Sequence, residues 1–111
     1  MKKFLVIYGS TVSAREQMMK ASPAQAKAGM DAWMAWSQKA GKAIVDPGAP
    51  VGNAAKLSNG KTTETKSEVG GFSIFQSESR DALAALLADH PHFKMPDATI
   101  EVHELLSLPG M

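Results

Sequence analysis

An unbroken apolar run near the start of the chain most constrains how it can fold. Phe4 to Tyr8 are all apolar or aromatic, several are β-branched, and Gly9 ends the run. Such a run is typical of a strand that is buried on both faces. The sequence therefore predicts a first strand that makes apolar contacts on both of its sides.

The clearest helix signal lies between Ser22 and Gly41. Ser22 can cap the free backbone donors, Pro23 suits the first helical position, and Gln25 can complete a capping box. Residues 10 to 21 show no dominant period, and we expect a loop there. The predicted helix places the following residues on one face, which we expect to meet the core: Ala26, Met30, Trp33, Met34, Ser37 and Ala40.

Trp36 lies beside this helical stripe rather than on it. One interpretation is that its ring forms a pocket wall or a surface for a partner. The other is a half-exposed tryptophan with no special role. The spacing alone leaves both interpretations open.

Turn residues divide the middle of the chain. Residues 42 to 45 predict a second strand that enters a turn at Asp46. Asn59-Gly60 is a strong hairpin signal, and it favours a β-arm made of residues 51 to 57 and the returning segment 62 to 66. The arm separates the second strand of the sheet from the third.

The last third of the chain predicts a strand, a helix and a final strand. The third strand is expected over residues 71 to 77, a helix follows from its cap at Ser79 to a stop at Pro91, and the fourth strand is expected over residues 99 to 105. Side chains alternate along the third strand, so that both of its faces receive an aromatic ring. One face carries Phe72, Ile74 and Gln76, and the other carries Ser73, Phe75 and Ser77.

The order β-α-β-β-α-β predicts an α+β protein with a ferredoxin-like fold, in which a four-stranded antiparallel sheet carries both helices on one face. At 111 residues, the chain is expected to form a single domain over residues 1–111. Apolar and aromatic side chains are expected on the uncovered face as well, so we predict that this face packs against a second copy. The resulting homodimer would be a dimeric α+β barrel with its two sheets face to face.

Composition excludes several classes of function. Lys and Arg number 12 against 11 Asp and Glu, so a basic surface for nucleic acid is not expected. Cysteine is absent, which excludes disulfides, thiolate nucleophiles and zinc-thiolate sites. The apolar run after Lys2-Lys3 is too short for a signal peptide or a membrane span, and a cytoplasmic location is expected. No glycine motif indicates a nucleotide, so we expect small-molecule ligands and no cofactor.

All three histidines gather around the end of the second helix and the strand that follows. The predicted topology brings His90, His92 and Phe93 to the sheet edge at which the first strand ends, near Tyr8. A cleft at this edge could also be walled by Trp36. We therefore take these side chains as candidate contacts for a substrate or ligand.

His92 is the leading candidate for acid/base chemistry, because Pro91 breaks the helix and can turn the next side chain toward a cleft. A neutral imidazole there can accept a substrate proton near neutral pH. Asp89 is the first candidate for a carboxylate that would fix its tautomer, and Asp46 and Asp31 are the others. The structural alternatives are that the imidazole caps the last carbonyls of the helix and that Asp46 initiates its turn.

Glu101 and His103 share one face of the predicted fourth strand, two positions apart. They are candidate contacts for a ligand held between two copies of the chain. Their spacing from His92 matches no established set of metal ligands, so no metal site is predicted. The alternative is a polar lining of the dimer interface.

Three parts of the chain resemble the YCII-related family, particularly its branch of DGPF-domain proteins. These parts are the opening residues 2–9, the turn at residues 59–60 with residues 64–72, and the closing residues 90–93 with residues 100–102. The resemblance spans nearly the whole chain and implies a dimeric α+β barrel. Most members of the family have no known biochemical role. A few relatives catalyse dehalogenation or lactone chemistry with a His-Asp pair.

The chain departs from the enzymatic relatives at two places. The first helix carries no histidine where those relatives have theirs, and Asn59-Gly60-Lys61-Thr62 replaces the Asp-Gly-Pro-Phe sequence. The catalytic pair of the family is therefore not transferred to this chain. Two classes of function remain: a cofactor-free lyase, isomerase or hydrolase that acts on a small ring or lactone with His92 as acid/base, and a non-catalytic dimeric module that binds a small molecule or regulates a partner. Whether the chain is an enzyme stays open at this point.

Overall fold

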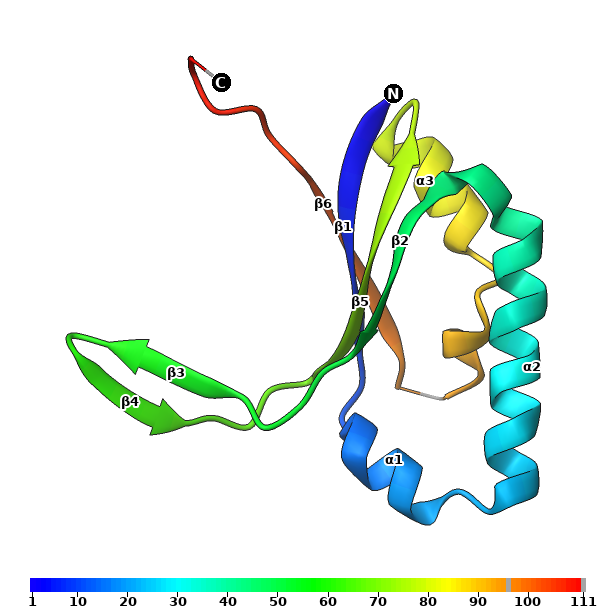
Figure 1. Cartoon of the computed structure of the whole chain (residues 1–111), viewed down its shortest axis with the longest axis vertical. Helices are drawn as coiled ribbons and strands as arrows, with labels where there is room; N and C mark the ends of the chain where they lie inside the picture. Colours follow the sequence, from blue (N-terminus) through cyan, green and yellow to red (C-terminus); the bar gives the residue numbers. More distant parts are fainter. Residues whose placement is uncertain (96, 111) are drawn as a thin grey trace.

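Four strands form one antiparallel sheet, and helices cover one of its faces (Figure 1). The computed structural model describes residues 1–95 and 97–110, without the side chains of residues 14 and 15. This arrangement confirms the predicted α+β class and ferredoxin-like topology. In their order across the sheet, the strands are β2 (Ile44–Pro50), β5 (Val69–Ser77), β1 (Lys2–Gly9) and β6 (Thr99–Glu104).

The two predicted helices are present as α2 (Pro23–Ala40) and α3 (Arg80–Leu87). The Ser22 hydroxyl accepts a hydrogen bond from the Gln25 backbone N–H at 3.1 Å, and the Gln25 side chain accepts one from the Ser22 N–H at 2.9 Å. This is the predicted capping box. Short 3₁₀ turns follow the two helices, at Gly41–Ala43 and Pro91–Lys94.

The prediction of a loop over residues 10 to 21 is wrong. A short helix, α1 (Ala14–Lys20), occupies most of this segment. Its N-terminus is held by the Ser13 hydroxyl, which accepts the Glu16 backbone N–H at 3.1 Å. A helix of 7 residues makes two turns, which is too few for a hydrophobic period to show in the sequence.

The core face expected for α2 is wrong at three positions, because Ala26, Met30 and Met34 are exposed. Met30 and Met34 are 63% and 56% exposed, whereas Trp36 is 6% exposed and belongs to the core. The helix is turned so that Trp36 packs on the sheet, where its ring lies 5.9 Å from that of Phe75. Large aromatic surfaces gain more from burial than flexible methionines, which explains this rotation.

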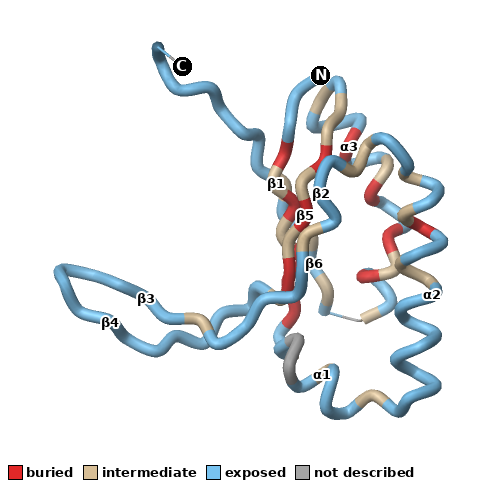
Figure 2. The backbone as a smooth tube through the Cα atoms, in the orientation of Figure 1, coloured by how far each residue is buried: buried red, intermediate tan, exposed pale blue. Residues whose placement is uncertain are grey.

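The core lies between the sheet and the helices. Phe4, Val6 and Tyr8 point from β1 toward the helices and are buried together with Phe75 and Leu83. Figure 2 shows the buried residues concentrated along β1 and β5 and on the parts of α2 and α3 that face them. Within the described residues, no helix has the length and apolar composition needed to cross a membrane.

The predicted β-arm is present and projects away from the sheet (Figure 1). It pairs β3 (Ala55–Ser58) with β4 (Lys61–Glu64) in antiparallel register. Asn59 and Gly60 have φ values of +50° and +75°, as a two-residue hairpin turn with both central residues left-handed requires. Every residue of the two strands is exposed.

The cap of α3 gives a first prediction. The Ser79 hydroxyl accepts the Ala82 backbone N–H at 3.0 Å. Replacing Ser79 with alanine should lower the free energy of unfolding by about 1 kcal/mol, because a helix donor loses its partner. Urea denaturation measures this change, and Ser79→Asp, which keeps an acceptor, is the matched control. Equal unfolding midpoints for Ser79→Ala and the wild type would contradict the assignment of the cap.

Candidate functional site

A cavity of about 40 Å³ lies between the sheet and the C-terminal half of α2. Most of its wall is apolar or aromatic, and a few polar groups converge on it, which is the usual composition of a small-molecule site. The residues that line it are Tyr8, Trp33, Trp36, Ser37, Ile44, Pro47, Ser73, Phe75 and His90.

The imidazole of His90, one of the residues that line the cavity, is an unusual polar group. The residue is 2% exposed, and its Nδ1 atom accepts the His92 backbone N–H at 3.0 Å. Nδ1 therefore carries a lone pair, and the proton of the neutral ring is on Nε2. Nε2 is buried and has no hydrogen-bond partner among the described residues. A buried donor without a partner costs about 1–3 kcal/mol, so this atom calls for an explanation.

Aromatic rings surround the imidazole of His90. The ring centroids of Trp36, Trp33 and Tyr8 lie 4.3, 4.4 and 5.1 Å from that of His90. Burial, followed by repulsion from His92, lowers the pKa of His90 to about 4, although the charge of Asp89 acts in the opposite direction. His90 is consequently neutral at pH 7.

A chain of hydroxyl groups forms the opposite polar side of the cavity. Tyr8 donates its phenolic proton to Ser73 Oγ at 3.0 Å, and Ser73 donates to the Pro47 carbonyl at 2.7 Å. Burial raises the pKa of Tyr8, and the Ser73 hydrogen bond opposes this in part. The turn after Pro47 requires a glycine, because Gly48 has a φ of +72° and a Cβ there would lie 1.7 Å from the Phe72 carbonyl oxygen.

His92 lies next to this cavity but does not line it. Its Nε2 atom is 2.9 Å from the Gly9 carbonyl oxygen and 3.1 Å from that of Thr99. Since carbonyl oxygens accept, Nε2–H is the donor, and Nδ1 of the neutral ring holds the lone pair. Backbone carbonyls thus fix the tautomer, a role that we had expected a carboxylate to play. They also tie His92 to the ends of β1 and β6.

Asp89 contacts α2 rather than a histidine. It accepts the Trp36 indole N–H at 3.1 Å and forms an ion pair with Lys39. The hydrogen bond from Lys39, and next the one from Trp36, lower the pKa of Asp89. The carboxylate holds Trp36 in its place on the cavity wall. It makes no hydrogen bond to His92 in the described part of the chain.

The other predicted contacts lie apart from the cavity. Asp46 accepts the Gly48 backbone N–H at 2.8 Å, which is the turn-initiating alternative. Phe93 is 44% exposed. His103 Nε2 lies 3.1 Å from a carboxylate oxygen of Glu101 on the face of the sheet that no helix covers. Of the predicted contacts, the structure therefore brings Tyr8, Trp36 and His90 together around one cavity.

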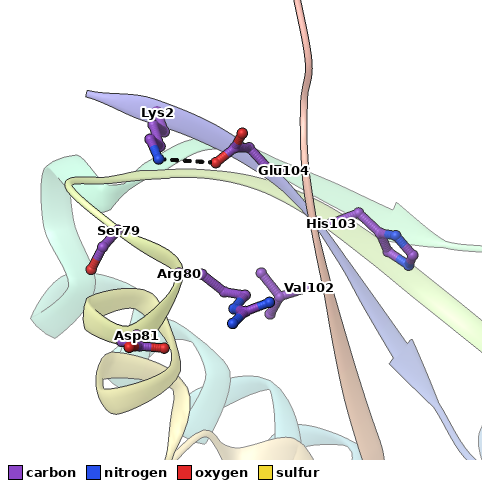
Figure 3. A pocket seen from close by; sticks show the side chains of 7 residues that line it. All are labelled: Lys2, Ser79, Arg80, Asp81, Val102, His103 and Glu104. Atoms are coloured by element: carbon purple, nitrogen blue, oxygen red, sulfur yellow. Dashed lines mark ion pairs between the residues drawn. The ribbon is translucent and has the colours of Figure 1, made fainter.

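A second, larger hollow of about 530 Å³ lies beside β6 and the start of α3 (Figure 3). The ion pair between Lys2 and Glu104 spans 3.3 Å at its rim, and Figure 3 shows the Arg80 side chain extending toward Val102. Its lining is exposed and mixes both charges, and no buried polar atom there lacks a partner among the described residues. We place the candidate site at the His90 cavity for this reason. The lining residues of the hollow are Lys2, Ser79, Arg80, Asp81, Val102, His103 and Glu104.

Sequence reasoning missed Ser73 and treated Trp33 as plain core. Ser73 carried a usable signal, because it places a hydroxyl on the same strand face as the core residue Phe75. Within residues 1–95 and 97–110, no three histidine or acidic side chains gather in a way that could hold a metal ion.

Nearly the whole chain is similar to known proteins. The sequence profile described as YCII-related domain matches residues 3–107. No curated protein sequence matches. Among solved structures, the chain is similar to 5-chloro-2-hydroxyhydroquinone dehydrochlorinase from Burkholderia phenoliruptrix AC1100, in its complex with 2,5-dihydroxybenzoquinone. The TM-score is 0.46 and the identity is 20%, over 89% of this chain and 90% of that chain.

Proposed function

We propose, since the chain belongs to the YCII-related family, that it binds a small ring compound at the His90 cavity and converts it without an organic cofactor, as a lyase, isomerase or hydrolase. The observation that carries this proposal is the buried Nε2–H of His90, which lacks a partner among the described residues. A ligand oxygen at this point would pair the donor, and the aromatic walls would enclose the ring.

The chemical role that we assign to His90 is hydrogen-bond donation. Its low pKa keeps the ring neutral at pH 7, so that Nε2–H is present and uncharged. Such a donor, already in place at a buried position, stabilises negative charge that develops on a substrate oxygen. This is the role that enolate-type intermediates of isomerases and lyases require.

His92 remains our candidate proton acceptor. Its Nε2–H donates to two backbone carbonyls, which leaves Nδ1 free to take a proton. It can act only on a ligand that extends beyond the present cavity toward the end of β1, because it does not line that cavity. Asp89 would act as a positioning residue through its hydrogen bond to Trp36.

A ring compound needs more room than about 40 Å³. An apolar cavity that binds benzene measures about 150 Å³. We propose that α2 moves outward to make this room. The N-terminal half of α2 is exposed, Met30 included, so few packing contacts of that half oppose such a movement.

Two substitutions at His90 test the ligand site. His90→Asn keeps an acceptor for the His92 N–H but removes the donor that faces the cavity, whereas His90→Gln offers an amide N–H there. With phenol, catechol and γ-butyrolactone as probes, calorimetry should give a dissociation constant roughly tenfold higher for His90→Asn than for the wild type. His90→Gln should retain most of the affinity. Equal affinities of the wild type, His90→Asn and His90→Gln for a probe would count against the proposal. So would a wild type that binds none of the probes.

The alternative is a non-catalytic module that binds a small molecule. It is favoured by one observation: in the described part of the chain, no carboxylate bonds to His90 or His92 to support proton transfer. Mass spectrometry of a bound probe after long incubation separates the two functions. Unchanged probe would favour the module, and a rearranged or hydrolysed product that His92→Gln fails to form would favour the enzyme.

We further propose that the protein acts as a homodimer. Leu5, Ile7, Phe72 and Ile74 lie on the sheet face that no helix covers, and each of them is only partly buried. An apolar centre with a polar rim is typical of protein interfaces, and the Glu101–His103 pair supplies part of such a rim. A second copy would cover this face with an identical one.

A further inference from the structure

The β3–β4 arm is exposed to solvent along both of its strands. All of its residues are exposed, and a hydrogen bond of 3.2 Å from the Thr65 N–H to the Ala54 carbonyl closes its base. A two-stranded hairpin alone in water is marginally stable at best. Its regular register therefore suggests that another surface stabilises it.

The arm and the C-terminal segment extend on the same side of the sheet. Figure 1 shows both on the side opposite the helices, one near each end of the strands. The C-terminal segment exposes Leu105, Leu106 and Leu108 at 48%, 78% and 64%. The uncovered sheet face thus lies between two projections that both carry exposed leucine side chains.

The area of the uncovered face is too small for a stable dimer by itself. Strands of 6 to 9 residues, rising about 3.3 Å per residue and spaced about 4.8 Å apart, give a four-stranded face of roughly 20 by 25 Å, or about 500 Å². Stable dimers bury about 800 Å² per partner. If two faces pair, further contacts must come from beyond the sheet.

We propose that the β3–β4 arm supplies these contacts by lying against a second copy of the chain, with Leu57 buried between them. The inference rests on the proposed pairing of the uncovered faces. Leu57 is 74% exposed in the protomer and lies opposite Thr62, so both are on one face of the hairpin. Lys56, opposite Thr63, lies on the other face. The face that carries Leu57, together with Ala55, Thr62 and Glu64, meets the partner, and the face that carries Lys56 and Lys61 stays in water.

Sedimentation equilibrium with matched variants tests the arm. Leu57→Glu places a charge on the face that we expect to be buried, and Thr63→Glu places the same charge on the opposite face. Leu57→Glu should raise the dimer dissociation constant at least tenfold, and Thr63→Glu should change it by less than about twofold. Replacing residues 55–64 with two glycines should weaken the dimer at least as much as Leu57→Glu. Leu57, Thr63 and the rest of residues 55–64 are exposed in the protomer, so circular dichroism should show an unchanged fold of the sheet and helices for all three variants.

The outcomes separate the arm from the pairing of the sheets. If Leu57→Glu and the shortened arm leave the dissociation constant within twofold while a charge on the sheet face dissociates the dimer, the arm proposal is overturned and the pairing stands. If the arm variants dissociate the dimer but a charge on the sheet face does not, the arm contacts a second copy in a dimer of another geometry, and both the pairing and the inference that rests on it are overturned. If the wild type is still a monomer at a protein concentration of about 100 μM, both the arm proposal and the pairing of the sheets are overturned.

Discussion

Lowering the pH from 7 to 4 is expected to remove about 3 kcal/mol from the free energy of unfolding through His90 alone. The folded protein holds the pKa of His90 at about 4, against 6.5 for an unperturbed histidine. Between these values the unfolded chain binds a proton at this position that the folded protein does not bind. Stability therefore falls as the pH drops through this window, and His90 has no effect above it.

Urea unfolding at several pH values between 4 and 7 measures this effect. Carboxylates also titrate in this range, so the informative quantity is the difference between the wild type and a variant. His90→Gln should lose most of the pH dependence that His90 contributes. His103→Gln is the matched control, because it removes a histidine from an exposed position outside the cavity. Parallel curves for the wild type and His90→Gln would show that His90 is not held neutral.

Replacing Ile74 with glutamate is expected to convert the proposed dimer into monomers. Ile74 lies on the uncovered face of β5, opposite Leu5 of β1. A two-fold axis would place the new carboxylate in the interface twice, where charges without partners cost several kcal/mol. The dissociation constant should rise by roughly a hundredfold or more, since 1.4 kcal/mol corresponds to a factor of ten.

Light scattering over a dilution series, combined with sedimentation, follows this change. Met34→Glu provides the control, because it adds the same charge at a position of α2 that is already 56% exposed. The control should have the oligomeric state of the wild type. An Ile74→Glu protein as dimeric as the control would show that the uncovered face is not the contact surface.

The sequence predicted the order of the elements because local signals mark their ends. Ser22 and Ser79 cap helices in the structure as expected, and Asn59-Gly60 closes the hairpin. These effects act between residues that are close in the chain. Helix α1 was missed since its cap at Ser13 is followed by a segment too short to show a period.

The rotation of α2 could not be read from the sequence. Two neighbouring stripes of the helix were apolar, and the choice between Met34 and Trp36 depends on the shape of the sheet surface opposite them. Phe75, which meets the Trp36 ring, is 39 positions further along the chain, so no local pattern records this contact.

The sequence predicted that two of the histidines lie near Tyr8, but not which atoms of their rings find partners. Sequence reasoning placed the histidines near Tyr8, and their rings lie 5.1 and 5.4 Å from it. It could not tell which ring nitrogen finds a partner. That depends on the carbonyl oxygens of Gly9 and Thr99, which converge on His92 and leave His90 to face the cavity.

Long-range ¹H–¹⁵N correlation spectra of the histidine rings, recorded at pH 7 while phenol is added, test the central claim most directly. We predict that His90 is neutral with its proton on Nε2, and that its Nε2 resonance shifts saturably with phenol while that of His103 stays in place. A positively charged His90, a proton on its Nδ1, or an Nε2 resonance that saturating phenol does not move would contradict the account.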